Sequence, residues 1–256
     1  MNGRGSTGPT VTAAVIALNE ERHIAACLGS LDWADERLVV DGGSTDRTAS
    51  LAQGAGARVV TRAFDDFARQ RQAAIEAATG DWLLFVDADE RVSGGLAAEI
   101  RRNIGRGEPG APVGYWVARR NYIWGRWIRG GGWWPDAQLR LFRRDRAGYA
   151  AERPVHEVAT VDGPVGRLRC ALVHYNYETV GQFVGKQRRY ARLEARRRIG
   201  LGERPRPRRL LSAPLREARR RLIEERGFVD GRHGAALAGL TALAALETQL
   251  LMLRRG

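Results

Sequence analysis

The sequence contains almost no lysine. A single lysine, Lys186, stands against 41 arginines in 256 residues, so the first 185 residues have none. Cysteine is also scarce, because only Cys27 and Cys170 occur, far apart and outside any C-x-x-C pattern. Neither a disulfide framework nor a zinc site is therefore supported, and a reducing cytoplasm fits this composition best.

The chain also lacks the features of an exported protein. Its first ten residues, "MNGRGSTGPT", are polar and contain no apolar core of a signal peptide, so we expect a disordered tail over residues 1–10. Near the other end, "AALAGLTALAALETQLLML" (235–253) has an unbroken apolar part of twelve residues before Glu247. A membrane span needs roughly 20 residues. This segment is therefore predicted to lie in a membrane interface or to pack as a helix.

Positive charge is abundant but confined to one part of the chain. The net charge is +13, yet residues 11–104 carry 15 acidic and only 10 basic residues. Residues 186–226 carry 16 basic and 5 acidic residues, a net of +11, on helical patterns separated by the breaker "GERPRPRR". We therefore predict that residues 178–256 form a basic helical extension. It would hold the protein on an anionic membrane surface, peripherally on the cytoplasmic inner face.

Strand and helix patterns alternate over the first part of the chain. Apolar runs at 11–18, 37–41, 57–61 and 82–87 are typical of buried strands, and a helical pattern follows each of the first three. Such alternation indicates parallel strands joined by right-handed crossovers. The predicted fold class is α/β, with a Rossmann-like, mostly parallel sheet flanked by helices.

Polar residues follow these strands at their carboxyl ends. Asn19 and Glu20 follow the first strand, Asp41 ends the second, and Asp87 and Asp89 follow the fourth in "WLLFVDADERV". Ligands of open parallel sheets bind beyond these strand ends, so we expect the side chains to line one crevice. Two carboxylates this close repel each other unless a cation intervenes. This argument predicts a hard divalent ion that holds a diphosphate.

Tryptophan is concentrated in the middle of the chain, where five of the seven lie between residues 114 and 145. Most of these rings fit a buried sheet edge as well as a binding surface. Trp133 and Trp134 differ because they follow a glycine triplet and directly precede Pro135 and Asp136. Flat aromatic faces suit sugar rings, so this pair is predicted to bind a sugar acceptor.

Four segments follow one another along the chain: "IALNEE" (16–21), "VVDGGSTDRT" (39–48), "ARQRQAAIEAATGDWLLFVDADE" (68–90) and "WWPDAQLRLFRR" (133–144). In this order they resemble the family 2 glycosyltransferases of the GT-A fold. Within that family the sequence is similar to small bacterial enzymes that extend lipopolysaccharide cores or related glycolipids, whose tails carry a phrase similar to "GFVDGRHG" (227–234). The resemblance implies a GT-A catalytic domain over residues 11–177, followed by the basic extension.

The resemblance also implies a reaction and the residues for it. One sugar would pass, with inversion, from a nucleotide diphosphate sugar to a glycolipid acceptor such as a lipopolysaccharide core, with Mg²⁺ or Mn²⁺ as cofactor. Asp136 is the implied catalytic base, with His156 and Glu157 as rivals. The implied metal ligands are Asp89, Asp87 and His156. The implied donor-binding residues are Ala17, Leu18, Asn19, Glu20, Asp41, Arg71 and Asp87.

Other functions fit parts of the sequence less well. A D-x-D phosphatase would use a lysine beside the phosphate, and none precedes Lys186. A nucleotidyltransferase would also want a Gly-rich phosphate loop after the first strand, and "ALNEER" (17–22) is not one. A nucleic-acid binder would interleave aromatic residues with its basic ones. The basic segment has few aromatics, so an anionic membrane or a phosphorylated glycolipid explains its arginines better than nucleic acid does. The absence of a Q-x-x-R-W motif favours transfer of one sugar per encounter over processive synthesis.

Overall fold

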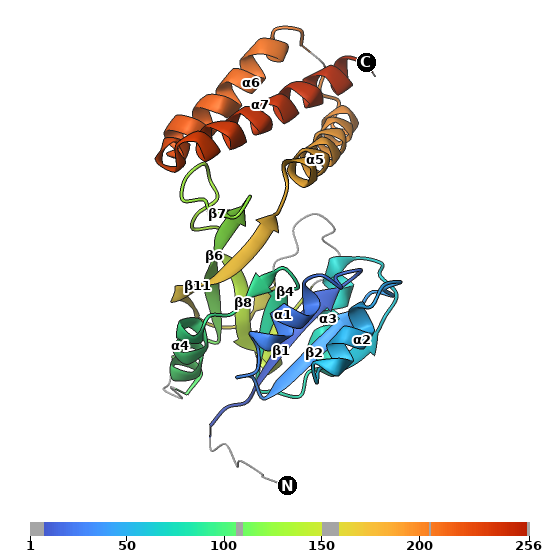
Figure 1. Ribbon diagram of the computed structural model, residues 1–256, viewed down its shortest axis with the longest axis vertical. Coiled ribbons are helices and arrows are strands. Elements are labelled where there is room, and N and C mark those ends of the chain that lie inside the picture. The colour runs from blue at the N-terminus through green and yellow to red at the C-terminus, as the bar shows by residue number, and fades with distance from the viewer. Residues whose placement is uncertain (1–7, 106–109, 150–158, 205, 255–256) are drawn as a thin grey trace. The chain divides into compact units, whose positions relative to one another are not determined.

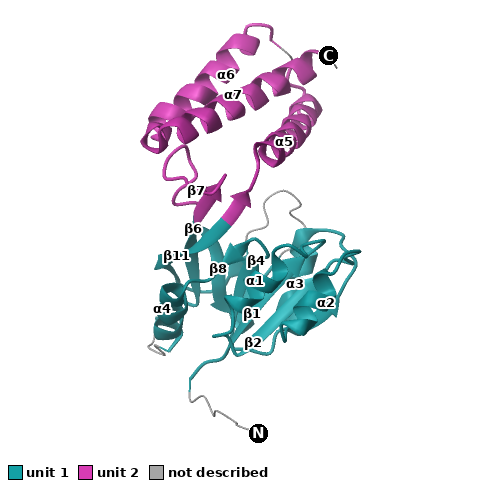
Figure 2. Cartoon of the chain, in the orientation of Figure 1, with its two compact units in different colours: residues 1–119, 137–174 teal, residues 120–136, 175–256 magenta. Residues whose placement is uncertain are grey.

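Two compact units make up the chain, and neither is a continuous segment (Figure 2). The computed structural model describes residues 8–105, 110–149, 159–204 and 206–254. The first unit contains residues 1–119 and 137–174, and the second contains residues 120–136 and 175–256. The boundary predicted after residue 177 lies close to the start of the helical part of the second unit, but that unit also includes Trp133, Trp134 and Asp136.

One large sheet of nine strands contains all but two of the strands in the described part of the chain (Figure 1). Its order is β3-β2-β1-β4-β8-β6-β11-β5, with β7 paired to β6. Neighbours are parallel among β1 (Val11–Ala17), β2 (Glu36–Asp41), β3 (Arg58–Thr61) and β4 (Trp82–Asp87). These four strands confirm the predicted parallel half of the sheet.

The other half of the sheet is antiparallel where β8 (Gln138–Arg143) pairs with β4 and with β6 (Gly114–Ile123). The two-residue strand β5 (Glu90–Arg91) is antiparallel to β11 (Val165–Tyr177). The remaining short elements are β7 (Arg126–Trp127), the 3₁₀ turn η1 (Arg144–Arg146), and the separate pair β9 (Ala147–Gly148) and β10 (Thr160–Val161).

Helices cover both faces of the sheet in the first unit. Strand β4 alternates strictly, because Trp82, Leu84 and Val86 join one core cluster and Leu83 and Phe85 join the other. Burying one large apolar side chain completely stabilises the fold by roughly 1.5–3 kcal/mol. Because β4 is buried on both faces, its sequence is a continuous apolar run. The first cluster includes residues of α1 (Ile24–Gly29), α2 (Thr48–Gly54) and α4 (Gly94–Ile104), and the second includes residues of α3 (Phe67–Ala77).

The second unit is a helical bundle with its own core. Helix α5 (Val180–Gly200) begins at a capping box formed by Thr179 and Gln182. The later elements are α6 (Arg209–Arg219), a π-helical turn η2 (Arg220–Glu224), a 3₁₀ turn η3 (Gly227–Asp230) and α7 (Arg232–Leu253). Helix α7 packs against both α5 and α6. Buried Ile123, Ile128, Tyr177, Phe183 and Leu237 form the core.

The "GFVDGRHG" segment (227–234) connects this bundle to the loop between β7 and β8 (128–137), hereafter the tryptophan loop. The buried carboxylate of Asp230 accepts hydrogen bonds from the backbone N–H groups of Arg129 and Gly130 at 2.8–3.0 Å. Glycine is required nearby, since a Cβ on Gly234 would lie 1.8 Å from the Gly227 carbonyl oxygen. The segment therefore holds the loop that carries Trp133 and Asp136, and the helices are part of the structure that presents them.

Helix α7 is longer than the apolar run that predicted it. It has 22 residues, which by length and composition alone are enough to cross a membrane. Glu247 lies within the helix, and the prediction that this segment lies in an interface or packs as a helix stays a prediction. Within its unit α7 buries the polar residues Thr241, Thr248 and Gln249, whereas Leu243 is 60% exposed.

Candidate active site

The loops after β1 and β2 are tied together at the carboxyl edge of the sheet. Asn19 adopts a left-handed backbone (φ 58°), which asparagine tolerates better than most residues. Its side-chain oxygen accepts a hydrogen bond from Thr45 N at 2.9 Å, and its own N–H donates to Ser44 Oγ at 2.9 Å. The N–H of Glu20 donates to Thr48 Oγ1 at 2.8 Å. These bonds fix the backbone that follows Ala17 and Leu18.

Asp41 ends β2 with one carboxylate oxygen occupied and the other without a partner. Its Oδ2 accepts hydrogen bonds from Gly43 N and Ser44 N at 3.1 and 3.0 Å. Its Oδ1 is buried and has no hydrogen-bond partner in the part of the chain that the structure describes. Buried acceptors are nearly always satisfied, so this oxygen is suited to accept a hydrogen bond from a ligand hydroxyl or amide.

Asp87 is neutralised by an arginine of the neighbouring strand. Arg140 on β8 is buried and donates hydrogen bonds to Asp87 from both terminal nitrogens. Nη1 donates to Oδ1 at 3.0 Å, and Nη2 donates to Oδ2. The same Nη2 lies 3.3 Å from Glu90 Oε1, while Glu90 Oε2 accepts a hydrogen bond from Asp87 N at 2.9 Å. Arg119 lies 3.6 Å from Glu90. The sequence argument that the two aspartates are uncompensated unless a cation binds is therefore wrong for Asp87.

The electrostatics of this network separate its two acids, partly exposed Asp87 and fully buried Glu90. Burial favours the neutral form of Asp87, but the charge and hydrogen bonds of Arg140, with the charges of Arg71 and Arg119, hold its pKa well below the usual range. Burial raises the pKa of Glu90, an effect that Arg140 opposes and the Asp87 charge reinforces. Asp87 is therefore an anion fixed in one orientation, suited to orient a ligand by hydrogen bonds.

Asp89 has no arginine partner among the ion pairs of the described residues, and the structure places a histidine beside it. His174 on β11 is buried, and its Nε2 lies 3.3 Å from Asp89 Oδ2. Sequence reasoning gave His174 no role. Its only sequence signal is a histidine near the end of an apolar strand, and the partner is 85 residues away.

Negative charge accumulates around Glu20. Burial, together with the charges of Asp89, Asp46 and Asp87, raises the pKa of Glu20 to about 7. A carboxyl pKa that neighbouring carboxylates raise means that one more negative charge is unfavourable at this site. A cation at this edge would relieve that charge.

A divalent metal fits this edge through few protein ligands. The described residues contain no group of three or more histidine, cysteine, aspartate or glutamate side chains placed to hold a metal ion. Asp89 and His174 offer one carboxylate and one imidazole, a donor pair that Mn²⁺ accepts and Mg²⁺ accepts through its oxygen. The predicted ligand His156 and the rival base Glu157 lie outside the described residues.

Arg71 on α3 reaches the same region. Its guanidinium lies 6.0 Å from the ring centroid of Phe85 and 5.7 Å from that of Tyr149. Its charge helps to lower the pKa of Asp87. With Tyr149 and Arg140 it also lines a small cavity of about 40 Å³.

The second unit holds the other predicted residues in different surroundings. Asn121 on β6 is fully buried, and its amide donates to Asp136 Oδ2 at 2.9 Å and to the Trp133 carbonyl at 2.7 Å. The Trp133 ring packs edge-on against Tyr177 in the core of the unit. Trp134 meets Trp127 edge-on, with ring centroids 5.6 Å apart. Trp133 is therefore largely a packing residue, Trp134 is the ring outside that core, and Asp136 has a buried partner that sequence reasoning did not identify.

A family model described as glycosyl transferase family 2 matches residues 12–153, more than half of the chain. The chain belongs to this family. It is 31% identical to the lipopolysaccharide core biosynthesis glycosyltransferase LpsC of Rhizobium meliloti, over 95% of this chain and 94% of that protein. An uncharacterized glycosyltransferase of Mycobacterium bovis is 32% identical over 59% of this chain and 66% of its own length.

Solved structures also resemble this glycosyltransferase. Glucosyl-3-phosphoglycerate synthase from Mycobacterium tuberculosis, in complex with Mn²⁺, UDP and phosphoglyceric acid, is 19% identical with a TM-score of 0.46. The match covers 74% of this chain and 78% of that one. The family match and the sheet confirm the GT-A fold and the resemblance found in the sequence.

Proposed function

We propose that this glycosyltransferase moves one sugar, with inversion, from a nucleotide diphosphate sugar to a glycolipid acceptor of the lipopolysaccharide-core type. The observation that carries the proposal is the match to LpsC, because it spans 95% of this chain and includes the helical unit as well as the catalytic fold. The name of that relative states lipopolysaccharide core biosynthesis. A transferase for a small soluble acceptor would have less use for a basic unit with many exposed leucines.

The carboxyl edge of the parallel strands supports donor binding. The unpartnered Asp41 Oδ1 would accept a hydrogen bond from the base or ribose, and the backbone after Ala17, including Leu18, Asn19 and Glu20, would border the nucleoside. Asp87, held by Arg140, would orient the ribose or sugar through its remaining lone pairs. Arg71 would lie near the diphosphate as a fixed positive charge.

Asp89 and His174 would hold a divalent metal, Mg²⁺ or Mn²⁺, against the donor diphosphate. A metal bound there would neutralise the charge of the leaving nucleoside diphosphate as a Lewis acid. The accumulated carboxylate charge around Glu20 favours a cation at this position.

Asp136 would act as the general base. Its carboxylate would take the proton of the acceptor hydroxyl as that oxygen bonds to the anomeric carbon and the bond from this carbon to the diphosphate breaks. Attack from the face opposite the leaving group inverts the centre in one step. Asn121 donates to Asp136 Oδ2 and so holds the carboxylate in one orientation.

A donor screen tests the reaction. Nucleotide diphosphate release would be measured for a panel of nucleotide sugars with Mg²⁺ or Mn²⁺, with and without a lipopolysaccharide-core glycolipid. We expect release that depends on both the glycolipid and the metal, and product analysis by NMR should find inversion. Retention at the anomeric carbon, or full activity in excess chelator, would reject the mechanism. Release with soluble acceptors only would reject the proposed acceptor.

The base is tested by Asp136→Asn. Loss of the proton acceptor should lower turnover by at least about 100-fold, while nucleotide binding stays near the wild-type value. Near-normal turnover of this variant, combined with loss in His156→Ala or Glu157→Gln, would move the base to the latter residues.

The helical unit supports a peripheral position on the cytoplasmic face of a membrane. Large apolar side chains are exposed on it, among them Leu201 (67%), Leu211 (75%), Leu215 (69%) and Phe228 (57%). The segment 186–226, which contains the three leucines, has a net charge of +11. Each basic residue near an anionic surface contributes about 1 kcal/mol, so several contacts would hold the protein reversibly while α7 lies in the interface.

Point variants test this position better than truncation, because removing the C-terminal helices would also remove Asp230 from the tryptophan loop. Leu211→Gln with Leu215→Gln should lower sedimentation with anionic vesicles, and 0.5 M salt, on the order of a few times physiological strength, should lower it further. Phe67→Gln serves as control, since Phe67 is 53% exposed in the first unit. Binding indifferent to anionic lipid would rule the position out, and resistance to carbonate extraction would mean that α7 spans the bilayer.

A further inference from the structure

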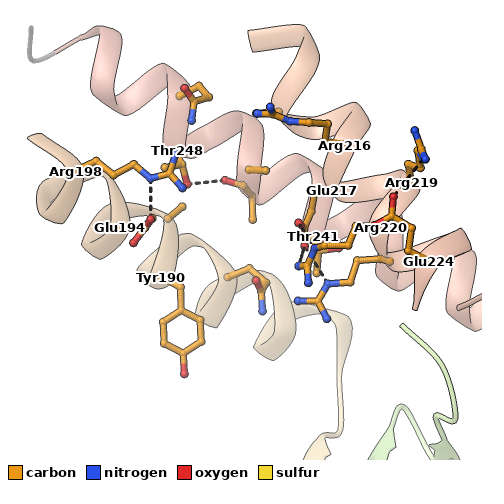
Figure 3. A pocket seen from close by; sticks show the side chains of 17 residues that line it. Tyr190, Glu194, Arg198, Arg216, Glu217, Arg219, Arg220, Glu224, Thr241 and Thr248 are labelled. Atoms are coloured by element: carbon orange, nitrogen blue, oxygen red, sulfur yellow. Dashed lines mark hydrogen bonds and ion pairs between the residues drawn. The ribbon is translucent and has the colours of Figure 1, made fainter. Parts of the chain in front are cut away.

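A cavity of about 630 Å³ lies among helices α5, α6 and α7 of the second unit (Figure 3). Side chains from all three helices line it, and the α7 contribution includes the polar residues Thr241 and Thr248. Five arginines and three glutamates line the cavity, so its wall carries a net charge of +2. The arginines are Arg198, Arg216, Arg219, Arg220 and Arg221.

The glutamates hold the arginines in place without using all their donors. Arg198 Nε donates to Glu194 Oε1 at 2.7 Å, and Arg221 Nε donates to Glu217 Oε1 at 2.9 Å. A guanidinium has five N–H donors in a fixed fork. The carboxylates therefore orient the forks and leave terminal N–H groups for an anion.

One guanidinium of the cavity wall has no ion pair within the described residues. It belongs to Arg216, whereas Arg219 and Arg220, three and four positions later, both form ion pairs. Gln249 on α7 also lines the cavity, and only 4% of this residue is exposed. A guanidinium without an ion pair and a glutamine amide in the wall of one cavity offer donors to an anion.

We propose that this cavity binds a phosphate monoester. Guanidinium forks match the oxygens of a phosphate, and the cavity has room for more than the phosphate itself. Each of the three helices also exposes a leucine, so this unit offers apolar surface to the chains of a phosphate carried on a lipid. These leucines are Leu193 (50% exposed), Leu215 (69%) and Leu250 (40%).

Calorimetric binding to the full-length protein tests the proposal, in chelator and without donor, so that it is independent of the sugar transfer proposed above. The probes are dihexanoyl phosphatidic acid below its micellar concentration and inorganic phosphate. We expect one equivalent to bind, and Arg216→Gln to weaken binding by about tenfold or more, because a charge-assisted bond is lost. Gln249→Leu should also weaken it. Arg206→Gln, at an exposed loop position outside the cavity, should bind as the wild type does.

The two probes identify the source of the phosphate. Tighter binding of phosphatidic acid assigns the cavity to a lipid phosphate, and equal binding of both probes assigns it to a small phosphorylated molecule. Unchanged binding by Arg216→Gln and Gln249→Leu, an equal loss in Arg206→Gln, or no binding by a wild-type protein of normal stability would overturn the proposal.

Discussion

The two ends of strand β2 carry acids that differ in how fully the protein satisfies them with hydrogen bonds. Glu36, at the amino end, accepts hydrogen bonds from Thr12, Arg58 and Thr79, and these lower its pKa to about 2 against the effect of its burial. Asp41, at the carboxyl end, keeps Oδ1 buried without a partner among the described residues. The hydrogen bonds of the first acid are completed by the protein, whereas the second keeps an oxygen that our proposal assigns to the donor.

The same contrast holds along the edges of the parallel strands. At the amino edge, Asp81 accepts hydrogen bonds from the N–H and hydroxyl of Thr10. At the carboxyl edge, Glu20 has a pKa raised to about 7 by burial and by neighbouring acids. Stability is therefore built at one edge, and unsatisfied charge accumulates at the edge where open parallel sheets bind ligands.

Arg140 is the exception at the carboxyl edge, because it neutralises acids there. Its removal is therefore expected to give the largest effect. Arg140→Met would leave Asp87 and Glu90 without their buried counter-charge, and breaking such a pair costs about 3–5 kcal/mol. Denaturant unfolding measures this loss. Arg143→Met on the same strand is the control, since Arg143 is exposed and pairs with exposed Asp145, which is worth about 0–1 kcal/mol. Equal losses in the two variants would mean that the network contributes little.

The next largest effect separates the two edges by function. Asp89→Asn should lower transfer by at least about 100-fold, as loss of a charged group at a reacting diphosphate does, and should leave stability unchanged. Asp81→Asn, at the other end of β4, should keep transfer and lose about 1 kcal/mol of stability. Initial rates and thermal unfolding of both variants measure the contrast. A fully active Asp89→Asn enzyme would remove the metal role from this residue.

Glu36 sharpens the comparison through pH. Its folded pKa of about 2 lies below the ordinary 4.5, so its contribution is complete above pH 4.5 and is lost as the pH falls toward 2. Glu36→Gln should therefore cost about 2 kcal/mol at pH 7 and progressively less below pH 4.5, with UDP binding unchanged. Unfolding free energies across this range test it, and a loss independent of pH would show that the charge of Glu36 is not its stabilising feature.

Glu20 should give the smallest effect and the opposite sign. Its folded pKa of about 7 lies above the ordinary 4.5, so the folded protein holds the proton more tightly and loses stability as the pH rises from 4.5 to 7. Glu20→Gln should be about 1 kcal/mol more stable than the wild type at pH 8 and equal to it near pH 4.5. If Glu20→Gln were less stable than the wild type at pH 8, the idea that negative charges repel one another at this edge would be contradicted.

Much of the first unit could be predicted because its signals are local. The run at 82–87 became β4, buried on both faces, and the alternation of strands and helices gave the parallel half of the sheet. The antiparallel half was harder to predict, since its strands pair across long insertions and do not follow a repeating strand–helix pattern. Helix α5 lies at the start of the predicted helical extension, and its ends carry local signals, a Thr179 cap and Gly200.

By itself the sequence determined which residues lie at the carboxyl ends of the strands, since strand periodicity and the order of the chain settle that locally. It also determined the family, through four segments in order. Only the tertiary structure decided the partners of these residues. Arg140 meets Asp87 across 53 positions, His174 meets Asp89 across 85, and Asp230 meets Gly130 across 100. Such pairs leave no periodic trace in the sequence, because each depends on which strand or helix packs beside another, and that choice is made by burial over the whole unit.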